Sequence, residues 1–413
     1  MRRQYKNSGT EWIEMIPETW EVNRFKNKFK TGKGLNITKG DLVPKGIPVV
    51  SYGQIHSKKN TGTHLDDLLI RYIPSELAKD GLSSKVSIGD FIFADTSEDI
   101  DGCGNAVYVD KEIGLFAGYH SVIAFAKNPK ESKFLAYLFL TECWRSQIRM
   151  RVTGIKVFSI SQAILNETTI IIPPVNEQLR IADYLDEKCG EINSLIELQE
   201  QMIEKLKTYK RIVITEAVTK GLNPNVQLVP SGIDWIGDIP EGWEVAKAKY
   251  FVVINNGSDP QLEGDIPVYG SGATSFKTCG EYKEGPTVLL GRKGATLHIP
   301  HYIDGKYWNV DTAFDVRSKG KMALRYYYFL AICFDYKYYI SQTTLPGMAQ
   351  SSYYNMKIPV PSVSEQQVIA NYLDGKCSEI DELIDVKQLK IEKLKDYKNS
   401  LIYECVTGKR EIA

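Results

Sequence analysis

The chain has 413 residues, and its 51 lysine and arginine residues balance 51 aspartate and glutamate residues, so its formal net charge is zero. This balance argues at first against a nucleic-acid-binding protein, which usually carries a basic excess, while a hydrophobic content of 43% excludes a wholly disordered chain. The sequence has no membrane-length apolar run, no signal peptide and no C-x-x-C motif, so we expect a cytoplasmic protein of roughly two to three domains.

The chain is an internal duplication. Segment 12–22 recurs at 235–245, and segment 177–219 matches 365–407 with 24 of 43 positions identical. Each copy therefore consists of a leading segment, a head and a long helix. The predicted divisions are a leading segment over 1–21, a first head over 22–173, a long helix over 174–222, a linker with the second leading segment over 223–244, a second head over 245–359 and a second long helix over 360–413.

The two heads are predicted to share one α/β fold. Short apolar runs bounded by glycine, proline, asparagine and aspartate predict strands in both heads, and one helix is expected in each, over 133–150 and 323–339. Residues 22–170 hold 20 basic and 15 acidic side chains, and residues 246–357 hold 13 and 9. The heads are thus mildly basic and the remaining segments acidic, so the zero total averages two kinds of surface.

The repeated helices show a seven-residue apolar pattern that is typical of a coiled coil. The obvious partner of each helix is the other copy, and antiparallel pairing would relate the halves by a pseudo-twofold axis. Amphipathic helices packed on their own heads are the alternative, but ~43 residues at ~1.5 Å rise extend ~65 Å, which is longer than a small domain. Polar residues Gln199, Lys387 and Lys390 interrupt the seam and could fix its register. The predicted seam consists of Ile192, Leu195, Met202, Leu206, Tyr209, Val213, Ile380, Leu383, Leu394, Tyr397 and Leu401.

Motifs for catalysis are weak throughout. No phosphate-binding G-x-x-x-x-G-K-[ST] sequence occurs, and residues 270–275 resemble only half of a dinucleotide loop. His298 and His301 flank Pro300 without a third ligand, so a metal site there is disfavoured. The acidic stretch 95–102 lacks the calcium-loop spacing; we interpret it as a solvated turn, with contact to a cytosine amino group as the alternative. We therefore predict no catalytic residues, no metal and no cofactor on this chain.

Three polar, glycine-rich loops in each head carry the residue types that read base edges or hold phosphates. Two such heads on a rigid spacer suit a split DNA site, although each loop could equally be an ordinary connector. The candidate DNA-binding residues are Tyr52, Gln54, His56, Lys58, Lys59, Arg149, Arg151, Lys156 and Ser159 in the first head, and Tyr269, Ser271, Lys277, Arg292, Lys293, Gln342, Thr343, Gln350 and Ser351 in the second.

Over nearly its whole length the chain resembles the specificity subunit of a type I restriction-modification enzyme. The resemblance rests on the duplicated segment Trp-Ile-Gly-Asp-Ile-Pro-Glu-Gly-Trp at 235–243, on Ile-Pro-Val-Pro at 358–361 followed by Glu365-Gln366, and on the repeated helices. The first copy departs slightly at 15–20 and 172–175.

This resemblance implies a noncatalytic DNA-specificity subunit. Each of two α/β target recognition domains would read one half of a split, asymmetric site, and the antiparallel coiled coil would set the spacer. The implied partners are double-stranded DNA, two modification (methyltransferase) subunits docked on the helices and two restriction (ATP-dependent nuclease) subunits, with no membrane. S-adenosylmethionine, ATP and Mg would bind to those partners. A scaffold for protein ligands and a stand-alone DNA enzyme are the alternatives.

Overall fold

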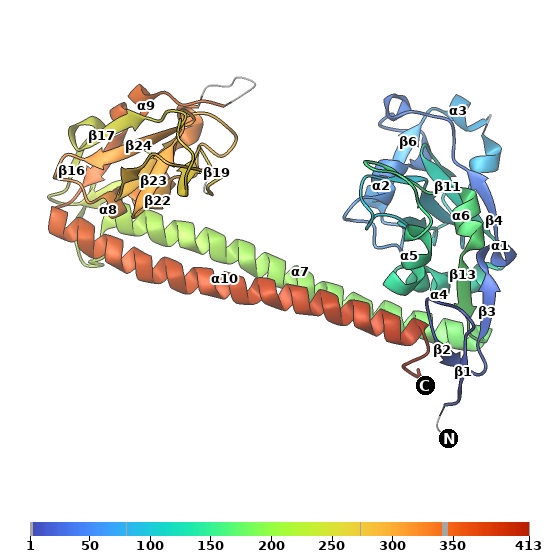
Figure 1. Ribbon diagram of the computed structural model, residues 1–413. Helices are drawn as coiled ribbons and strands as arrows, with labels where there is room; N and C mark the ends of the chain where they lie inside the picture. The colour runs from blue at the N-terminus through green and yellow to red at the C-terminus, as the bar shows by residue number, and fades with distance from the viewer. Residues whose placement is uncertain (1–2, 80, 273, 341–345, 413) are drawn as a thin grey trace. The chain divides into compact units, whose positions relative to one another are not determined.

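The computed structural model describes residues 3–79, 81–272, 274–340 and 346–412 (Figure 1). It divides into two compact units, one formed by residues 1–197 with 391–413 and the other by residues 198–390. In the part of the chain that is described, no helix is both long and apolar enough to cross a membrane.

The described residues of the first unit form thirteen strands and six short α-helices before the first long helix. The strands are β1 (Tyr5–Asn7), β2 (Met15–Pro17), β3 (Glu21–Arg24), β4 (Phe29–Lys33), β5 (Ile47–Val50), β6 (Arg71–Ile73), β7 (Phe91–Ala94), β8 (Thr96–Ser97), β9 (Ala106–Tyr108), β10 (Phe116–Ala117), β11 (Ser121–Ala126), β12 (Phe158–Ser159) and β13 (Thr169–Ile172). The helices are α1 (Phe25–Lys28), α2 (Tyr52–Ile55), α3 (Ser75–Lys79), α4 (Pro129–Phe139), α5 (Glu142–Arg149) and α6 (Gln162–Glu167).

The second head repeats this plan with fewer elements. Its strands, with those of its leading segment, are β14 (Leu228–Pro230), β15 (Asp238–Pro240), β16 (Glu244–Lys247), β17 (Val252–Asn256), β18 (Ile266–Tyr269), β19 (Lys277–Cys279), β20 (Lys283–Glu284), β21 (Thr287–Gly291), β22 (His301–Ile303), β23 (Lys306–Asn309), β24 (Ala313–Ser318) and β25 (Lys357–Val360). Its helices are α8 (Leu324–Cys333) and α9 (Gln350–Asn355), and the long helices are α7 (Val175–Lys220) and α10 (Val363–Val406).

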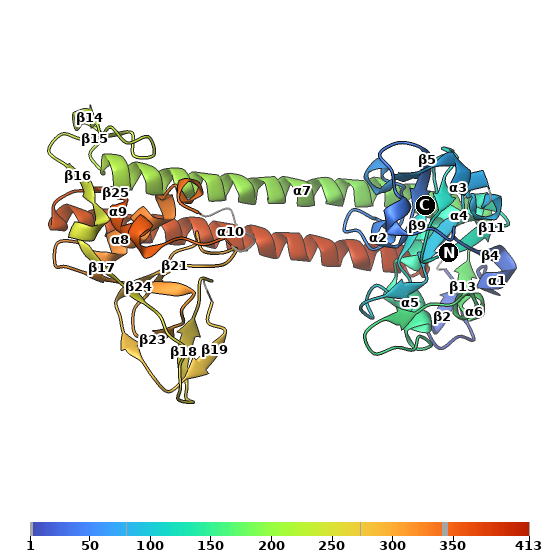
Figure 2. The same cartoon turned by 90° about the horizontal axis from the view of Figure 1, so that it is seen from above.

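Both heads are built on the same antiparallel four-stranded sheet. The strand order is β4-β11-β7-β9 in the first head and β17-β24-β21-β22 in the second. The helix that follows β11 or β24 in the chain packs against one side of its sheet: α4 contacts the edge strand β9, and α8 contacts the edge strand β22 and its neighbour β21. A second sheet, β19-β18-β23-β20, lies at one end of the second head (Figure 2). The prediction of one α/β fold used twice is confirmed.

The predicted head helices are shorter than expected. The single helix expected over 133–150 is two helices, because the chain turns between α4 and α5, where Thr141 Oγ1 donates to the carbonyl of Leu138 at 2.6 Å. The helix expected over 323–339 ends with α8 at Cys333, and only a 3-10 turn follows at Tyr336–Tyr338. Apolar residues recur beyond both breaks and are buried, among them Trp144, Ile148 and Phe334, so the sequence pattern did not reveal where each helix ends.

The long helices begin in the same way in both copies. Gln178 Nε2 donates to the carbonyl of Pro173 at 2.8 Å, and Gln366 Nε2 donates to that of Pro361 at 3.0 Å. Each bond gives a hydrogen-bond partner to a proline carbonyl that lies just before the helix and outside its regular hydrogen bonding. The same two glutamines were part of the repeated sequence, so their role in starting the helix explains why both copies contain them.

Antiparallel pairing of α7 with α10 occurs in each unit. In the first unit Lys398 Nζ donates to Asn193 Oδ1 at 3.0 Å, and in the second Lys210 Nζ lies 2.6 Å from Asp381 Oδ2. The stripe of buried and half-buried residues advances by alternating steps of four and three residues in each helix. It comprises Ile192, Ile196, Gln199, Ile203, Leu206, Lys210 and Val213 in α7, and Ile380, Ile384, Lys387, Ile391, Leu394, Lys398 and Leu401 in α10.

For five residues the prediction that they lie in the seam is wrong. They lie between 36% and 54% exposed and so point away from the seam; they are Leu195, Met202, Tyr209, Leu383 and Tyr397. The stripe instead uses the residue that follows each of these five: an isoleucine after Leu195, Met202 and Leu383, and a lysine after Tyr209 and Tyr397. At Leu195, Met202 and Leu383 the next residue is also apolar, so the sequence pattern alone could not select the inward one, and at Tyr209 and Tyr397 the pattern favoured the tyrosine over the lysine that follows it.

Candidate nucleic-acid interface

The three loops of the first head that were selected by their polar side chains meet at one place. Strand β8 pairs antiparallel with β12, which joins the loop after residue 94 to the loop before residue 161. His56 Nε2 lies 3.0 Å from the carbonyl of Thr96, so the loop that follows β5 joins the same cluster. The structure therefore brings together residues about 100 positions apart in the chain.

Within this cluster, the predicted residues nearest α2 hold the loop in place. Ser51 N donates to Gln54 Oε1 at 3.2 Å, and the rings of Tyr52 and His56 pack in a tilted arrangement with centroids 4.6 Å apart. Asn105 Nδ2 lies 3.2 Å from His56 Nδ1, so both imidazole nitrogens of His56 have protein partners. Burial and the nearby carboxylates raise the pKa of Tyr52, so its hydroxyl stays a hydrogen-bond donor at neutral pH.

A groove of about 860 Å³ runs beside these loops. Among the described residues other than glycine, only His120 has a positive φ, of 51°, and its Nδ1 lies 3.3 Å from Asp95 Oδ1. Of the predicted residues, Ser159 lines the groove. Asp95 and Thr96, from the acidic stretch 95–102, and Ser161, two residues after Ser159, line it as well. The polar lining residues that no local motif marks in the sequence are Lys33, Asn36, Tyr119, His120, Ser121 and Gln162.

The two predicted arginines of the first head support the loop stem. Arg149 donates to Glu142 Oε1 at 2.6 Å and to the carbonyl of Asp101 at 3.1 Å, and Arg151 donates to the carbonyl of Gln147 at 2.7 Å. By contrast, three predicted lysines stand exposed on the loops, where they can meet a polyanion: Lys58, Lys59 and Lys156.

The loops of the second head also converge. Met348 N donates to the carbonyl of Arg292 at 2.9 Å, and Lys293 forms an isolated antiparallel bridge with Gly347. A Cβ placed on Gly294, which has φ +115°, would lie 2.9 Å from Ser271 Oγ, so the loop after β18 is adjacent as well. This tight approach explains the glycine, since another side chain would strain the backbone and crowd the serine.

Some of the predicted residues of the second head are held by contacts within the head, and others are exposed on its surface. Gln350 Nε2 donates to the carbonyl of Ile254 at 2.6 Å, and Tyr269 packs against the ring of His301 at 5.4 Å, so both stabilise the head. Arg292 Nη1 lies 3.4 Å from the carbonyl of Asp311. The exposed candidates are Lys277, Lys293 and Ser351, while Gln342 and Thr343 lie outside the described residues.

The described residues include no group of three or more histidine, cysteine, aspartate or glutamate side chains placed to hold a metal ion. Burial lowers the pKa of His301, which leaves it neutral in its contact with Tyr269. In the acidic stretch, Asp99 Oδ1 accepts from Gly102 N at 2.6 Å and thereby closes its own turn. These groups therefore perform local structural roles.

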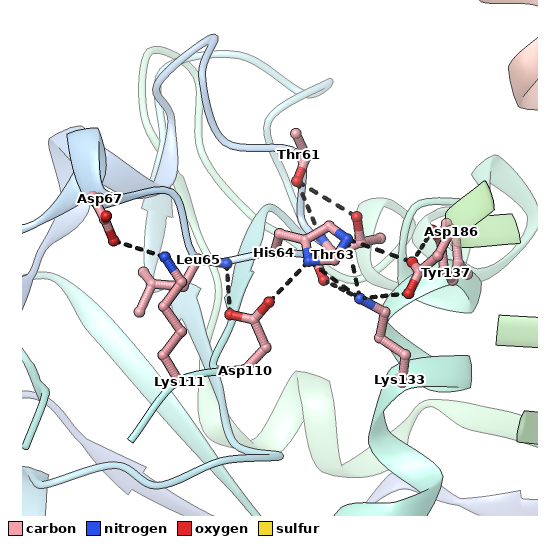
Figure 3. Close-up of polar contacts among 10 residues, drawn as sticks. All are labelled: Thr61, Thr63, His64, Leu65, Asp67, Asp110, Lys111, Lys133, Tyr137 and Asp186. Carbon is pink, nitrogen blue, oxygen red and sulfur yellow. Dashed lines mark hydrogen bonds and ion pairs between the residues drawn. The ribbon is translucent and has the colours of Figure 1, made fainter. Parts of the chain in front are cut away.

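A polar network that the sequence did not reveal attaches the first head to α7 (Figure 3). His64 Nδ1 lies 2.9 Å from Asp110 Oδ2 and its Nε2 lies 3.5 Å from Asp186 Oδ1, while Lys133 Nζ lies 3.2 Å from Asp186 Oδ2. Tyr137 also donates its hydroxyl hydrogen to Asp186. Hydrogen bonds to Asp110 and Asp186 raise the pKa of His64 to about 9, so the imidazole is charged at neutral pH.

The second head has a matching attachment to α10. Arg325 Nε donates to Asp374 Oδ1 at 2.6 Å, and Asp374 is the repeat counterpart of Asp186. The guanidinium of Arg325 also lies over the rings of Tyr302 and Tyr328, at 4.5 and 5.0 Å. The repeated Tyr-Leu-Asp sequence is thus the place where each head helix is fastened to its long helix. The unrepeated basic partner, Lys133 or Arg325, gave no sequence signal.

Comparisons with known proteins show the same duplicated organisation. The family described as "Type I restriction modification DNA specificity domain" matches residues 17–211 and again residues 240–396. The type I restriction enzyme MjaVIII specificity subunit of Methanocaldococcus jannaschii is 24% identical to this chain, with 95% of this chain and 93% of the relative covered.

Two solved structures have a similar fold at 16% sequence identity. One, from work on complex assembly and conformational transition of the type I R-M system, has a TM-score of 0.73, with 96% of this chain and 99% of that chain covered. The other, the HsdS subunit from Thermoanaerobacter tengcongensis, has a TM-score of 0.50, with 96% of this chain and 98% of that chain covered.

Proposed function

Because this chain belongs to the family of type I restriction modification DNA specificity domains, we propose that it is the noncatalytic DNA-specificity subunit of a type I restriction-modification complex. The observation that carries the proposal is the contrast between the repeated framework and the heads. The sheet order, the helix starts and the attachments at Asp186 and Asp374 recur, whereas the loop residues differ. Two heads that share a framework and differ in their loops suit a site with two unlike halves.

Each head would read one half of the site through its loop cluster. In the first head, the exposed lysines would hold phosphates, and polar groups of the groove, such as Ser159 and His120, would face base edges. In the second, Lys277 and Lys293 would take the phosphate role. We assign residues 22–173 and 245–359 to the two recognition domains. The acidic leading segments and helices are unsuited to DNA contact and would face protein.

The long helices carry a repeated apolar surface that we assign to the modification subunits. Three exposed residues of α7 have exposed apolar counterparts in α10, each 188 positions later. The pairs are Leu195 with Leu383, Leu198 with Val386, and Tyr209 with Tyr397. Because the same patch occurs twice, it fits two copies of one partner. In this proposal two restriction subunits complete a cytoplasmic complex, and S-adenosylmethionine, ATP and Mg bind to the partners.

Exchange of one head tests the proposal. The segment 22–173 would be replaced by the corresponding head of another family member, and methylated bases would be mapped across the genome of a host that supplies the modification subunits. We expect a gapped motif in which one half changes and the other half is retained. Loss of the chain should abolish the motif. A motif that survives deletion of this chain, or changes in both halves after the exchange, contradicts the proposal.

A further inference from the structure

The loop between α5 and β12 exposes an isoleucine at its tip. Ile155 is 97% exposed, more than any other large hydrophobic side chain in the described part of the chain. Its neighbours in the loop, from Thr153 to Val157, are all exposed as well. Such a side chain contributes nothing to the core, and its exposure to water is unfavourable, so the folded chain alone gives no reason for an apolar residue here.

The loop is held in a fixed shape at its stem. Val152 N donates to the carbonyl of Ile148 at 3.0 Å, and Ser159 N donates to that of Thr153 at 3.2 Å. At Gly154, where φ is +149°, an added Cβ would lie 2.0 Å from the carbonyl oxygen of Val157. Only glycine fits this close turn, so the backbone presents Ile155 outward as a preset feature of the head.

The surroundings of the tip indicate a polyanionic ligand. Lys156 is exposed next to Ile155, while at the stem Arg149 pairs with Glu142 and Arg151 lies 3.8 Å from Glu167. The loop leads directly into β12, whose Ser159 lines the groove of the first head. An apolar tip next to an exposed lysine, beside a polar groove, combines attraction to the DNA backbone with a group that can enter the base stack.

We propose that Ile155 is a wedge that inserts between two base pairs in the half-site bound by the first head. Isoleucine is among the side chains that proteins insert at base steps, where insertion partly unstacks the bases and kinks the duplex. Specificity then includes the ease with which a base step opens, so flexible pyrimidine–purine steps are favoured at this position without a hydrogen bond to either base. This inference rests on the proposed function, because it requires the first head to bind duplex DNA.

The test uses the full chain and a duplex that the wild-type chain selects from a random-sequence library. 2-Aminopurine replaces in turn each adenine, on either strand, of the half-site that changes when the first head is exchanged, and its fluorescence reports unstacking. We expect a rise at one base step with the wild-type chain. Ile155→Ser should lose this rise and bind about ten- to a hundred-fold more weakly, because the apolar contact is lost. Ile155→Leu should retain both.

Two variants serve as controls. Leu82→Ser removes another strongly exposed apolar side chain of the first head, and it should leave the fluorescence and the affinity unchanged. Lys156→Ala should lower the salt dependence of binding and keep the fluorescence rise, because it removes a phosphate contact. All these positions are exposed, so we expect unchanged thermal unfolding.

The outcomes separate the wedge from the proposed function. Tight wild-type binding without any unstacked step overturns the wedge and leaves DNA recognition intact. The same holds if Ile155→Ser keeps the signal, or if Leu82→Ser loses it equally. A wild-type chain that selects no duplex, alone or with its modification subunits, overturns the proposed function itself.

Discussion

Gln199 and Lys387 occupy the same position in the two copies of the long helix and contact each other, with Lys387 Nζ 3.4 Å from Gln199 Oε1. In an antiparallel pair, only a residue at the centre of the duplicated pattern can meet its own counterpart. This contact therefore marks the register in which the apolar stripes of α7 and α10 align. Gln199 is only 5% exposed, so a shift of the helices would leave its amide buried without this partner.

Replacement of Gln199 and Lys387 by leucine should change the stability of the helix pair. We expect Gln199→Leu with Lys387→Leu to raise the free energy of unfolding by about 1 kcal/mol, because apolar groups fill the seam. Gln199→Leu alone should lower it by about 1 kcal/mol, since the ammonium then faces leucine. Denaturant unfolding measures both, and Lys390→Leu at an exposed position is the control. Equal stability of the single and double variants would show that the contact is unimportant.

The end of α10 depends on a glycine that packs against the first leading segment. Gly408 has φ +75°, and an added Cβ would lie 2.4 Å from Pro17 Cγ. Gly232 has a similar φ of +72° but open space around it, so it isolates the backbone effect. We expect Gly232→Ala to cost about 1 kcal/mol of stability and Gly408→Ala roughly 1–3 kcal/mol more. Thermal unfolding tests this, and equal losses would contradict the packing argument.

The attachment of the first head should weaken at high pH. Because the pKa of His64 is raised from 6.5 to about 9, its stabilising contribution is fully present below pH 6.5 and is lost as pH rises through about 9. His64 is half-exposed, so we expect screening to limit the loss to about 1 kcal/mol. Unfolding measured at pH 6, 8 and 10 should show this slope in the wild type.

The matched variant for this effect is His64→Gln, which keeps a polar group but cannot be protonated. It should be less stable than wild type at pH 6 and equal to it at pH 10. The second head offers an internal comparison, because the guanidinium of Arg325 stays charged across this range. A pH profile of His64→Gln identical to that of the wild type would exclude His64 as the titrating group.

Lengthening of both long helices should change the gap of the recognised site. One heptad inserted between Glu191 and Leu206, and another between residues 379 and 394, preserves the seam and adds ~10 Å. At 3.4 Å per base pair, the gap in the methylated motif should grow by about three base pairs. A four-residue insertion breaks the stripe and should abolish methylation instead. An unchanged gap after heptad insertion would refute the spacer role.

Arg292 and Lys293 should differ in their effect on binding. The loop that carries them is closed by Gly294, and the Arg292 side chain makes a long contact, at 3.4 Å, to the carbonyl of Asp311 and lies 5.8 Å from the centre of the Phe314 ring. If Arg292 reads a guanine, Arg292→Ala should cost ~1–3 kcal/mol and relax specificity at one position. Lys293→Ala should weaken binding to all sequences and reduce its salt slope by about one. Competition binding to single-substitution duplexes distinguishes the two, and unchanged specificity would remove Arg292 as a reader.

The duplication made the framework predictable from sequence. Repeated residues such as Gln178 and Gln366 proved to form repeated hydrogen bonds, and the heptad spacing predicted the antiparallel pairing of α7 with α10. The face of each helix was less certain, because Leu195 and Ile196 are both apolar and only packing decides which one is buried.

The candidate interface was predictable only as a set of loops. Side-chain chemistry selected segments that do converge, but it could not tell supporting residues from available ones. Arg149 and Gln350 are held by protein partners, whereas Lys58 and Lys156 are exposed. The groove around His120 is formed by residues that are distant in the chain. The positive φ of His120 could not be predicted from the sequence either.

The end of each long helix packs against the leading segment of the other copy, which bears on fragments that contain only one copy. Gly408 of α10 lies against Trp20, whose indole donates to Glu177 at 3.1 Å, and Gly221 after α7 lies against Trp243, whose indole donates to Glu365 at 3.2 Å. Each leading segment thus receives the terminus of the helix from the opposite copy. A fragment with one leading segment, one head and one helix possesses both halves of this joint. Two such fragments can complete each other, and the resulting homodimer would select an inverted-repeat DNA sequence.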